Sequence, residues 1–302
     1  MTAKSGYVAI IGKPNAGKST LMNALIGEKL SIITDKPQTT RKRILGILTE
    51  DDYQIIFIDT PGILNPEYLL QERMLGFVHN SVKDADIILF IVDVADDPDA
   101  KKTLSDEKVF NILKDSQSKK IILLNKVDLS NQVTVENTIR GLSSNKLFEK
   151  VIPVSAGFGY NLTSVKNAIV ELLPEHPKYF PDEDLSDADE RFFVTEIIRE
   201  KVFEMYRDEV PYSTEVIIEE FKERSKGKDF INASIIVERD TQKKIIIGTS
   251  GEKIKKLGKI SREAVESFLQ RQVYLELFVK VREKWRSNPS MLKSFGYTAP
   301  DE

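Results

Sequence analysis

The 302-residue sequence contains no cysteine and only two histidines. Without cysteine the chain can form neither disulfides nor thiolate metal sites, and His79 and His176 are too far apart in sequence to suggest a zinc site. No stretch approaches the ~18 consecutive apolar residues of a membrane-spanning helix, and residues 1–7 lack the apolar run of a signal peptide. We therefore expect a cytoplasmic protein without a disulfide or zinc partner, for which peripheral attachment to a membrane stays open.

A strong net charge is also lacking, since 44 basic residues against 47 acidic ones leave a formal charge of −3. The charges are nevertheless unevenly distributed. Residues 181–189 contain five acidic residues and no basic one, whereas residues 243–262 contain seven basic residues and one acidic residue. A local basic segment in a nearly neutral chain predicts a localised anionic partner rather than general electrostatic adhesion.

The first 175 residues alternate apolar runs with helical patterns. A helix is predicted at residues 18–26, and strands are predicted at 7–11, 43–49, 53–59, 87–93, 120–125 and 151–155. Repeated strand–helix units are typical of an α/β fold with a doubly wound, mostly parallel sheet. Ligands bind such sheets beyond the carboxyl ends of the strands, so we expect the functional residues there.

Three prolines and the acidic run then interrupt the alternation. They predict a first domain of residues 1–175, a linker at 176–190 and a second domain of 191–302, which the chain is long enough to contain. The second domain reads as α+β, with helices at about 191–206 and from 252 to about 270, and strands at 213–221, 231–237 and 273–281. Residues from Trp285 onward show no clear periodicity.

The segment Gly12-Lys13-Pro14-Asn15-Ala16-Gly17-Lys18-Ser19 matches the pattern G-x-x-x-x-G-K-[ST] and is followed by Thr20. It comes after a predicted strand and opens a predicted helix, as a phosphate-binding loop does. Its glycines let main-chain N–H groups surround phosphate oxygens. We expect Lys18 to reach the β- and γ-phosphates and Ser19 to place its hydroxyl on Mg²⁺. The alternative is a glycine-rich turn with an accidental lysine.

Two further polar segments end predicted strands. In Asp59-Thr60-Pro61-Gly62, the acid could reach Mg²⁺ and the Gly62 N–H could bond a γ-phosphate, although this pattern also marks ordinary turns. In Asn125-Lys126-Val127-Asp128, the Asp128 carboxylate could accept hydrogen bonds from the ring N–H and the amine of guanine, which adenine does not offer together. Asn125 would orient the loop, and the stem of Lys126 would lie along the base. Ser155 and Ala156 close the last strand, where a backbone N–H could meet the guanine oxygen.

These motifs occur together, in this order, and each lies at the end of a predicted strand. Over about residues 6–175 they resemble the translation-factor-like GTPases. The resemblance implies GTP and GDP as ligands, Mg²⁺ as a cofactor, and a switch threonine in Gln38-Thr39-Thr40-Arg41 that closes over the metal. We favour Thr40, with Thr39 as the alternative.

The next residue, Ile63, is counted among the expected nucleotide-binding residues, but it departs from Ras-like GTPases, in which a glutamine at this place orients the attacking water. We therefore expect slow intrinsic hydrolysis that relies on Mg²⁺, on Lys18, Thr40 and Gly62, and on some further charge. A potassium ion near Asn15 is one candidate, since GTPases of this type with asparagine there often use K⁺. The alternative is that Asn15 only hydrogen-bonds the backbone of its own loop.

In the second domain, Ile247-Gly248-Thr249-Ser250-Gly251 precedes a predicted helix that carries Lys253, Lys255 and Lys256. The G-x-x-G loop resembles that of KH domains, where close backbone approach clamps single-stranded RNA and lysines contact phosphates. The alternative is a tight turn before a solvated amphipathic helix.

A P-loop GTPase domain joined by a short acidic linker to a KH-like domain resembles the Era-type bacterial GTPases along nearly the whole chain. This resemblance implies binding of small-subunit ribosomal RNA near its 3′ end during ribosome assembly, and partial association with the inner face of the cytoplasmic membrane. Two other readings stay open. A passive RNA-binding adaptor that hardly hydrolyses GTP would suit Ile63, and a tRNA-modification GTPase would share the first domain but leave the KH-like loop unexplained.

Overall fold

The computed structural model describes residues 3–298, which form two compact units. The first unit ends at Asp187, and the second begins at Ala188 and also includes Tyr68–Leu70. Each unit contains its own sheet and its own apolar core.

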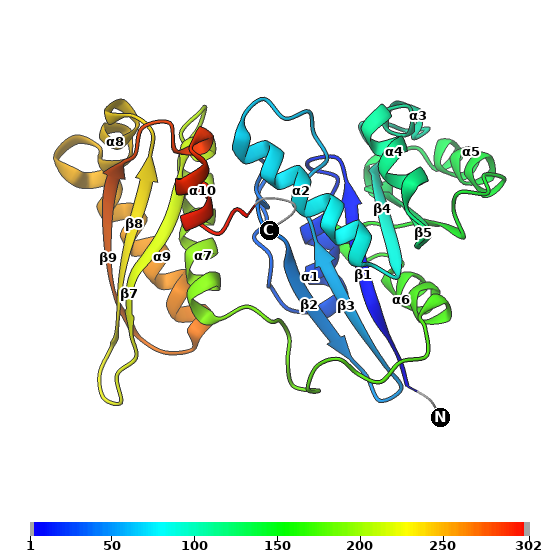
Figure 1. Ribbon diagram of the computed structural model, residues 1–302, viewed down its shortest axis with the longest axis horizontal. Coiled ribbons are helices and arrows are strands. Elements are labelled where there is room, and N and C mark those ends of the chain that lie inside the picture. The colour runs from blue at the N-terminus through cyan, green and yellow to red at the C-terminus, as the bar shows by residue number, and fades with distance from the viewer. Residues whose placement is uncertain (1–2, 299–302) are drawn as a thin grey trace. The chain divides into compact units, whose positions relative to one another are not determined.

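The first unit contains a six-stranded sheet with the order β2-β3-β1-β4-β5-β6 (Figure 1). Its strands are β1 (Lys4–Gly12), β2 (Ile44–Thr49), β3 (Tyr53–Asp59), β4 (Ile87–Asp93), β5 (Lys119–Asn125) and β6 (Lys150–Pro153). All neighbouring strands are parallel except β2 and β3, which are antiparallel. The predicted doubly wound, mostly parallel fold is thereby confirmed.

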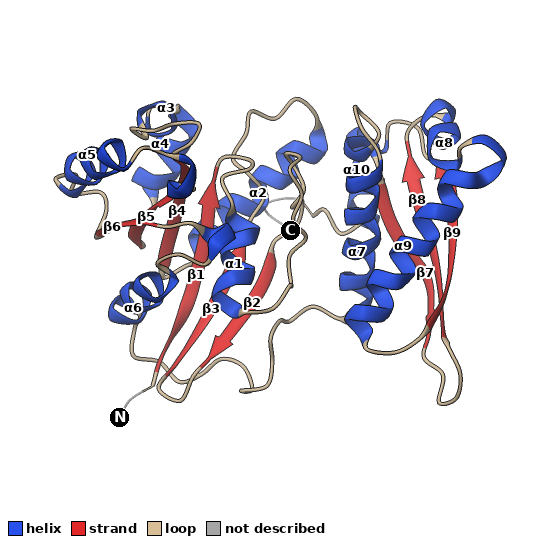
Figure 2. Cartoon of the chain, turned by 180° about the vertical axis from the view of Figure 1, so that it is seen from behind, coloured by secondary structure: helices blue, strands red, loops and turns tan. Residues whose placement is uncertain are grey.

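Helices cover both faces of this sheet, as Figures 1 and 2 show from opposite sides. One face carries α1 (Lys18–Ile26) and α6 (Leu162–Leu172). The other carries α2 (Leu69–Asp84), α3 (Lys101–Leu104), α4 (Glu107–Asp115) and α5 (Gln132–Ser143), which share one apolar core. Because both faces are covered, consecutive β4 residues from Ile87 to Val92 are at most 1% exposed.

Part of the acidic segment before the second unit lies along the edge of the first sheet. The carbonyl of Leu185 accepts a hydrogen bond from the Ile47 N–H at 2.8 Å, and the Ser186 hydroxyl donates to the Leu45 carbonyl at 2.6 Å. Gln54 on β3 accepts from the Phe180 N–H and donates to its carbonyl. The segment therefore covers the free edge of β2, whose backbone groups would otherwise face solvent.

The second unit has a three-stranded sheet with the order β7-β8-β9, in which β7 is antiparallel and β9 parallel to β8. Its strands are β7 (Glu215–Lys222), β8 (Asp229–Val237) and β9 (Val273–Val281), and its helices are α7 (Glu190–Met205), α8 (Asp240–Ile247), α9 (Glu252–Leu269) and α10 (Pro289–Ser294). Sequence analysis did not anticipate α8 or α10. Both are short, and in α8 the β-branched run that ends at Ile247 obscures the helical period.

The helix α7 is buried on two sides. Val194, Ile198 and Val202 face the sheet core, as their spacing predicted. Arg199 lies on another side and is 1% exposed. Burial alone would lower its pKa, but the neighbouring carboxylates of Glu196 and Glu215 raise it, so the guanidinium stays charged. The chain after β9 covers this second side.

Candidate nucleotide and RNA sites

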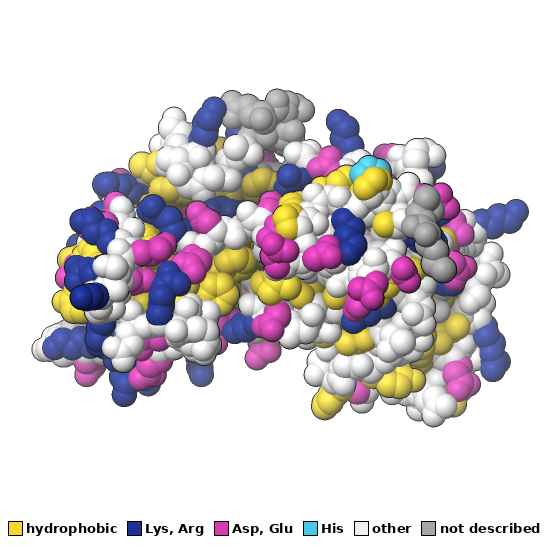
Figure 3. Space-filling model, turned by 90° about the horizontal axis from the view of Figure 1, so that it is seen from below, with side chains coloured by type: hydrophobic (Ala, Val, Ile, Leu, Met, Phe, Trp, Pro, Cys, Tyr) yellow, Lys and Arg dark blue, Asp and Glu magenta, His cyan; other side chains and the backbone are white. Residues whose placement is uncertain are grey.

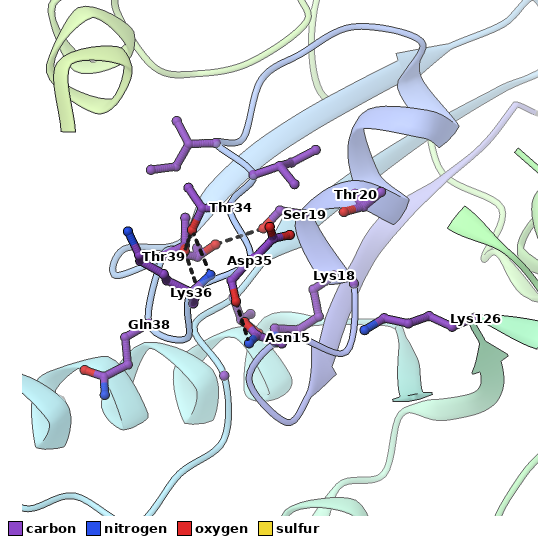
Figure 4. Close-up of a pocket in the computed structure, with 16 residues that line it drawn as sticks. Asn15, Lys18, Ser19, Thr20, Thr34, Asp35, Lys36, Gln38, Thr39 and Lys126 are labelled. Carbon is purple, nitrogen blue, oxygen red and sulfur yellow. Dashed lines mark hydrogen bonds between the residues drawn. The ribbon is translucent and has the colours of Figure 1, made fainter. Parts of the chain in front are cut away.

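A cavity of about 310 Å³ opens at the carboxyl ends of β1 and β3 in the first unit (Figure 4). Nine residues predicted around the nucleotide line it, namely Asn15, Gly17, Lys18, Ser19, Thr20, Thr40, Thr60, Gly62 and Lys126. The remaining lining comes from residues 32–39, which we call the switch segment together with Thr40. Apart from Gln38 and Thr39, sequence analysis did not single out this segment, because it has no motif of its own. Its place just before Gln38-Thr39-Thr40-Arg41 is the one signal that points to it.

Lys18 lies at the first position of α1 and is 6% exposed. Its ammonium donates to the carbonyls of Lys13 at 2.9 Å and Gly12 at 3.3 Å, which hold it inside the phosphate loop, residues 12–19. Burial lowers its pKa to about 8, and Asp59 opposes that effect. An anion bound beside Lys18 would compensate for this burial and favour the charged form.

Side-chain oxygens of three residues meet beside this cavity: Ser19 and Thr40 line it, and Asp59 lies buried behind them. The Ser19 hydroxyl donates to Asp59 Oδ2 at 2.6 Å and lies 2.8 Å from Thr40 Oγ1. Asp59 is fully buried, its Oδ1 atom has no hydrogen-bond partner among the described residues 3–298, and burial raises the pKa of its carboxyl group. Hard oxygen ligands around an unsatisfied carboxylate oxygen fit Mg²⁺.

Thr39 is placed differently from Thr40. Its hydroxyl donates to the Lys36 carbonyl at 2.7 Å and lies 2.6 Å from Thr34 Oγ1, so it is engaged within the switch segment (Figure 4). Thr40 Oγ1 instead lies 3.4 Å from Asp59 Oδ2. Of the two candidates, Thr40 is therefore the one that the fold brings to the other oxygen ligands.

Asn15 contacts the switch segment rather than the backbone of its own loop. It adopts a positive φ of 61°, and its side-chain amide donates to the Asp35 carbonyl at 3.1 Å, as the dashed line in Figure 4 marks. This contact joins the phosphate loop to the switch segment directly above the cavity.

Asn125 links the loops that were predicted to surround guanine. Its amide donates to the Ala16 carbonyl at 2.8 Å, and its side-chain oxygen accepts from the Ala156 N–H at 2.9 Å. Lys126 follows with φ of 65° and pairs with Asp93 at 2.6 Å. Asp128 is exposed and does not line the cavity. Sequence analysis did not identify Asp93, which ends β4.

Ile63 lies outside the cavity, although we expected it among the nucleotide-binding residues. Its side chain is 3% exposed and belongs to the apolar core with Val78 and Phe90. The backbone of Ile63 contacts the phosphate loop, because its N–H donates to the Gly12 carbonyl at 3.0 Å. Preceding it, Gly62 has no room for a side chain, since a Cβ would lie 2.7 Å from the Pro14 backbone.

The G-x-x-G sequence of the second unit forms the turn between α8 and α9, and we call residues 248–251 the clamp loop. Gly248 and Gly251 have φ of 73° and 77°, a region that suits glycine. Thr249 and Ser250 are exposed at its tip. Lys253, Lys255 and Lys256 are exposed on the first turns of α9, while Ile247 and Ile254 are half-buried beneath them. The loop thus combines accessible backbone, cations and an apolar floor.

Comparison with known families assigns each unit separately. Residues 7–126 match a family described as 50S ribosome-binding GTPase, and residues 209–286 match the KH domain.

Whole-chain comparisons match both units together. The chain is 46% identical over 293 residues to GTPase Era of Geotalea daltonii, covering 97% of each chain. It is 45% identical to a chloroplastic ERA-like GTPase of Oryza sativa, of which it covers 69%. A crystal structure of Aquifex aeolicus Era bound to GDP and AlF4⁻ superposes with a TM-score of 0.92 at 39% identity, covering 98% of this chain and all of that one.

A second solved structure extends the comparison to RNA. Era in complex with MgGDPNP and nucleotides 1506–1542 of 16S ribosomal RNA superposes with a TM-score of 0.93, at 39% identity over 98% of this chain and 100% of that chain. These matches span both the nucleotide cavity and the clamp loop. The chain therefore belongs to the Era family of GTPases, GTP-hydrolysing proteins with a C-terminal KH domain.

Proposed function

We propose that the protein is a GTP-driven switch that binds small-subunit ribosomal RNA during assembly of that subunit. In this proposal residues 1–175 bind and hydrolyse GTP, residues 176–190 connect, and residues 191–302 hold the RNA. The observation that carries it is the presence of two separately built sites in one chain, an oxygen-lined phosphate cavity and a cationic clamp loop. The related Era complex with MgGDPNP and 16S RNA supports the pairing of these ligands.

In the nucleotide site, Ser19, Thr40 and Asp59 would hold Mg²⁺, which neutralises charge on the β- and γ-phosphates. Lys18 would leave the carbonyls of Gly12 and Lys13 for the phosphate oxygens. The Gly62 N–H would meet the γ-phosphate, and closure of Thr40 over the metal would connect the γ-phosphate to the position of the switch segment. Loss of that phosphate on hydrolysis would then release the segment.

Guanine selection would rest on Asp128, with the loops on either side fixed by Asn125. Because Asn125 bonds both Ala16 and Ala156, it aligns the phosphate loop with the loop that offers a backbone N–H to the guanine oxygen. Lys126, paired with Asp93, keeps its stem beside the place of the base. Base and phosphate recognition are therefore joined through one buried side chain.

Because the apolar side chain of Ile63 cannot assist hydrolysis, we assign the further charge that hydrolysis needs to a potassium ion. The Asn15 amide already donates to a switch-segment carbonyl, that of Asp35, so the side chain lies between the phosphate loop and the switch segment. A monovalent cation held between the Asn15 side-chain oxygen and a switch-segment carbonyl would stabilise charge that develops on the leaving oxygen.

A passive nucleotide-holding adaptor is the second candidate, and the burial of Ile63 in the core is the observation that favours it. Phosphate release in Mg²⁺ above a Lys18→Ala control separates the two candidates. Replacing Asp59 by asparagine should reduce that release about 100-fold or more, because the metal loses its charged partner. Release equal to that of Lys18→Ala in the native protein would leave the adaptor as the better account.

RNA identity can be tested by ultraviolet crosslinking followed by sequencing of the bound RNA. Reads near the 3′ end of small-subunit RNA are expected, and reads confined to large-subunit RNA would contradict the proposal.

Peripheral contact with the inner face of the cytoplasmic membrane also belongs to the proposal. Within residues 3–298, none of the helices has the length and apolar character of a membrane span. Cosedimentation with anionic vesicles, followed by salt washes, tests the proposed surface contact.

A further inference from the structure

The sheet of the second unit has two different faces. On one face Ile231, Val273 and Leu275 belong to the apolar core beneath α7 and α9. The residues between them in sequence point to the opposite face, since side chains alternate along a strand. There Tyr274 is 54% exposed and Phe278 is 49% exposed. Two large aromatic rings on one strand are thus accessible on the face away from the helices.

These rings form part of an ordered row. Lys222 on β7 lies opposite Phe230 on β8, which lies opposite Tyr274 on β9. The rings of Phe230 and Tyr274 stack, with centroids 6.0 Å apart and planes at 15°. Phe278 follows Tyr274 by four residues, about 13 Å along the same side of the strand. We call Phe230, Tyr274 and Phe278 the aromatic face.

The other end of this sheet face is already covered. Tyr297 donates to Glu215 at 2.6 Å, and the Trp285 indole donates to the Ser213 carbonyl at 2.9 Å, which holds the C-terminal segment against the start of β7. Ile236, which lies opposite Glu215 on this face, is 2% exposed. The exposed rings of Tyr274 and Phe278 therefore lie between this covered end and the β7–β8 hairpin.

That hairpin carries a cluster of cations. Residues 222–228 contain four basic residues and one acidic residue. Lys226 and Lys228 have no ion-pair partner within residues 3–298. Gly227 turns the chain with φ of 94°, and nothing lies within 4 Å of the position of a Cβ, so the tip projects into solvent. Figure 3 views the molecule from below, the side to which this hairpin points in Figure 1, and shows basic side chains gathered at this end among acidic ones.

The charged side chains on this sheet face separate the places that suit phosphates from those that suit bases. Glu220, Asn232 and Glu276 form the next row, between Tyr274 and Phe278. The carboxylates of Glu220 and Glu276 disfavour phosphates over the middle of the face, and Lys222 forms an ion pair with Glu220. Phosphates are therefore favoured at the hairpin tip and uncharged bases on the rings. Exposed rings beside cations are the combination with which proteins hold unpaired nucleotides.

We propose that the aromatic face and the hairpin tip form a second RNA site, in which unpaired bases stack on Tyr274 and Phe278 while Lys226 and Lys228 contact the backbone. The inference rests on the proposed function, because it takes RNA as the ligand of this unit. The nine residues of β8 span about 26 Å from the hairpin, and α8 leads from the far end of this strand to the clamp loop. One RNA would thus be held at two places by different nucleotides.

Binding of 16S nucleotides 1506–1542, and of a series shortened from either end, tests the proposal. Tyr274→Ala should weaken binding of the full fragment about tenfold, and Tyr274→Phe should keep it, because stacking needs the ring alone. Lys226→Ala and Lys228→Ala should each lower the salt slope by about 0.7. Phe110→Ala, which removes a ring 46% exposed on α4, is the matched control and should bind normally.

The RNA length series supplies the decisive readout. The affinities of the native protein and Tyr274→Ala should converge once the nucleotides beyond the clamp loop are removed, which a folding defect would not produce. If Tyr274→Ala and Phe278→Ala both bind the full fragment normally while Gly251→Asp does not, the second site is overturned and the face serves a protein instead. If Gly251→Asp also binds normally, the RNA clamp of the proposed function is contradicted.

Discussion

Glycine is required in the phosphate loop and in the clamp loop for different reasons. At Gly17, which has φ of 99°, a Cβ would lie 2.3 Å from the Asn125 amide nitrogen, so the protein itself has no room for a side chain. At Gly251, with φ of 77°, the nearest atom to a Cβ would be Ile254 Cγ2 at 4.0 Å. The phosphate loop is closed against its own fold at Gly17, whereas the clamp loop is open at Gly251, where the missing side chain leaves space for a ligand.

The same contrast extends to the polar groups around each loop. Lys18, Asp59 and Asn125 are buried and hydrogen-bonded within the first unit. Lys253 and Lys256 are exposed on α9. A preorganised, buried site suits a small ligand of fixed shape, and exposed cations suit a long, flexible polyanion. Changes in the first loop should therefore damage the protein, and changes in the second should damage binding alone.

The largest effect is expected for Gly17→Ala. The methyl group would collide with Asn125 and force a positive φ on alanine, so we expect loss of GTP binding and a free energy of unfolding lowered by about 2 kcal/mol or more. Nucleotide titration and urea unfolding measure the two effects. Gly141→Ala is the control, since nothing lies near its Cβ position on α5. Normal stability of Gly17→Ala would remove the distinction drawn between the loops.

Gly251→Asp should separate binding from folding. Asp tolerates a positive φ better than most residues and meets open space here, so the protein should stay folded and bind GTP. Its carboxylate would repel the phosphate that approaches the loop, and RNA binding should be lost. Gly251→Asn is the matched variant of equal shape without the charge, and it should keep more of the binding in a mobility assay. Equal binding by both variants and the native protein would place the clamp elsewhere.

The features that could be predicted from the sequence are those that depend on residues close together in the chain. The order of strands and helices, the phosphate loop and the clamp loop follow from periodicity and from glycines at fixed spacing. Asn23 is an example of a residue whose contacts the sequence does not predict. Its side-chain oxygen accepts from the N–H groups of Leu30 and Ser31, and its amide donates to the Ser31 carbonyl, which anchors the start of the switch segment to α1. A buried asparagine in a helix has no sequence pattern that reveals such partners.

The C-terminal segment was missed for a related reason. Trp285 and Tyr297 are fully buried, yet Trp285 lies in a three-residue helical turn and Tyr297 in the irregular chain after α10, so neither belongs to a periodic pattern. Their partners, Ser213 and Glu215, are 72 and 82 residues away in sequence. Only tertiary packing makes these residues part of a core, and periodicity reports secondary structure alone. The exposed state of Asp128 could not be foreseen either, because its motif specifies a ligand and not its accessibility.

Asp128→Asn should change base choice with little effect on the fold, because the side chain is exposed. The amide presents a donor where guanine offers donors, and the loss of paired hydrogen bonds should weaken GTP binding by about 1–3 kcal/mol. Xanthosine triphosphate has a carbonyl in place of the guanine amine and should then be preferred. Competition between the two nucleotides measures this preference. Unchanged GTP affinity without any gain for the xanthine nucleotide would contradict the assignment.

The smallest effect is expected from potassium, and it concerns the one place where the phosphate loop is open. Asn15 is exposed and meets the Asp35 carbonyl. Hydrolysis should run faster in KCl than in NaCl at equal ionic strength, by less than the ~10³-fold that an arginine finger gives. Asn15→Ala should abolish the difference and leave nucleotide affinity nearly intact.

A second substitution tells a cation ligand from a structural contact. Asn15→Asp keeps a side-chain oxygen but cannot donate to the Asp35 carbonyl. If the oxygen binds K⁺, the difference between the two salts should persist in Asn15→Asp and vanish in Asn15→Ala. If both variants lose it, the hydrogen bond to the switch segment is what matters. If the native protein itself shows equal rates in the two salts, potassium has no part in hydrolysis, and the missing charge must come from RNA or from a ribosomal partner.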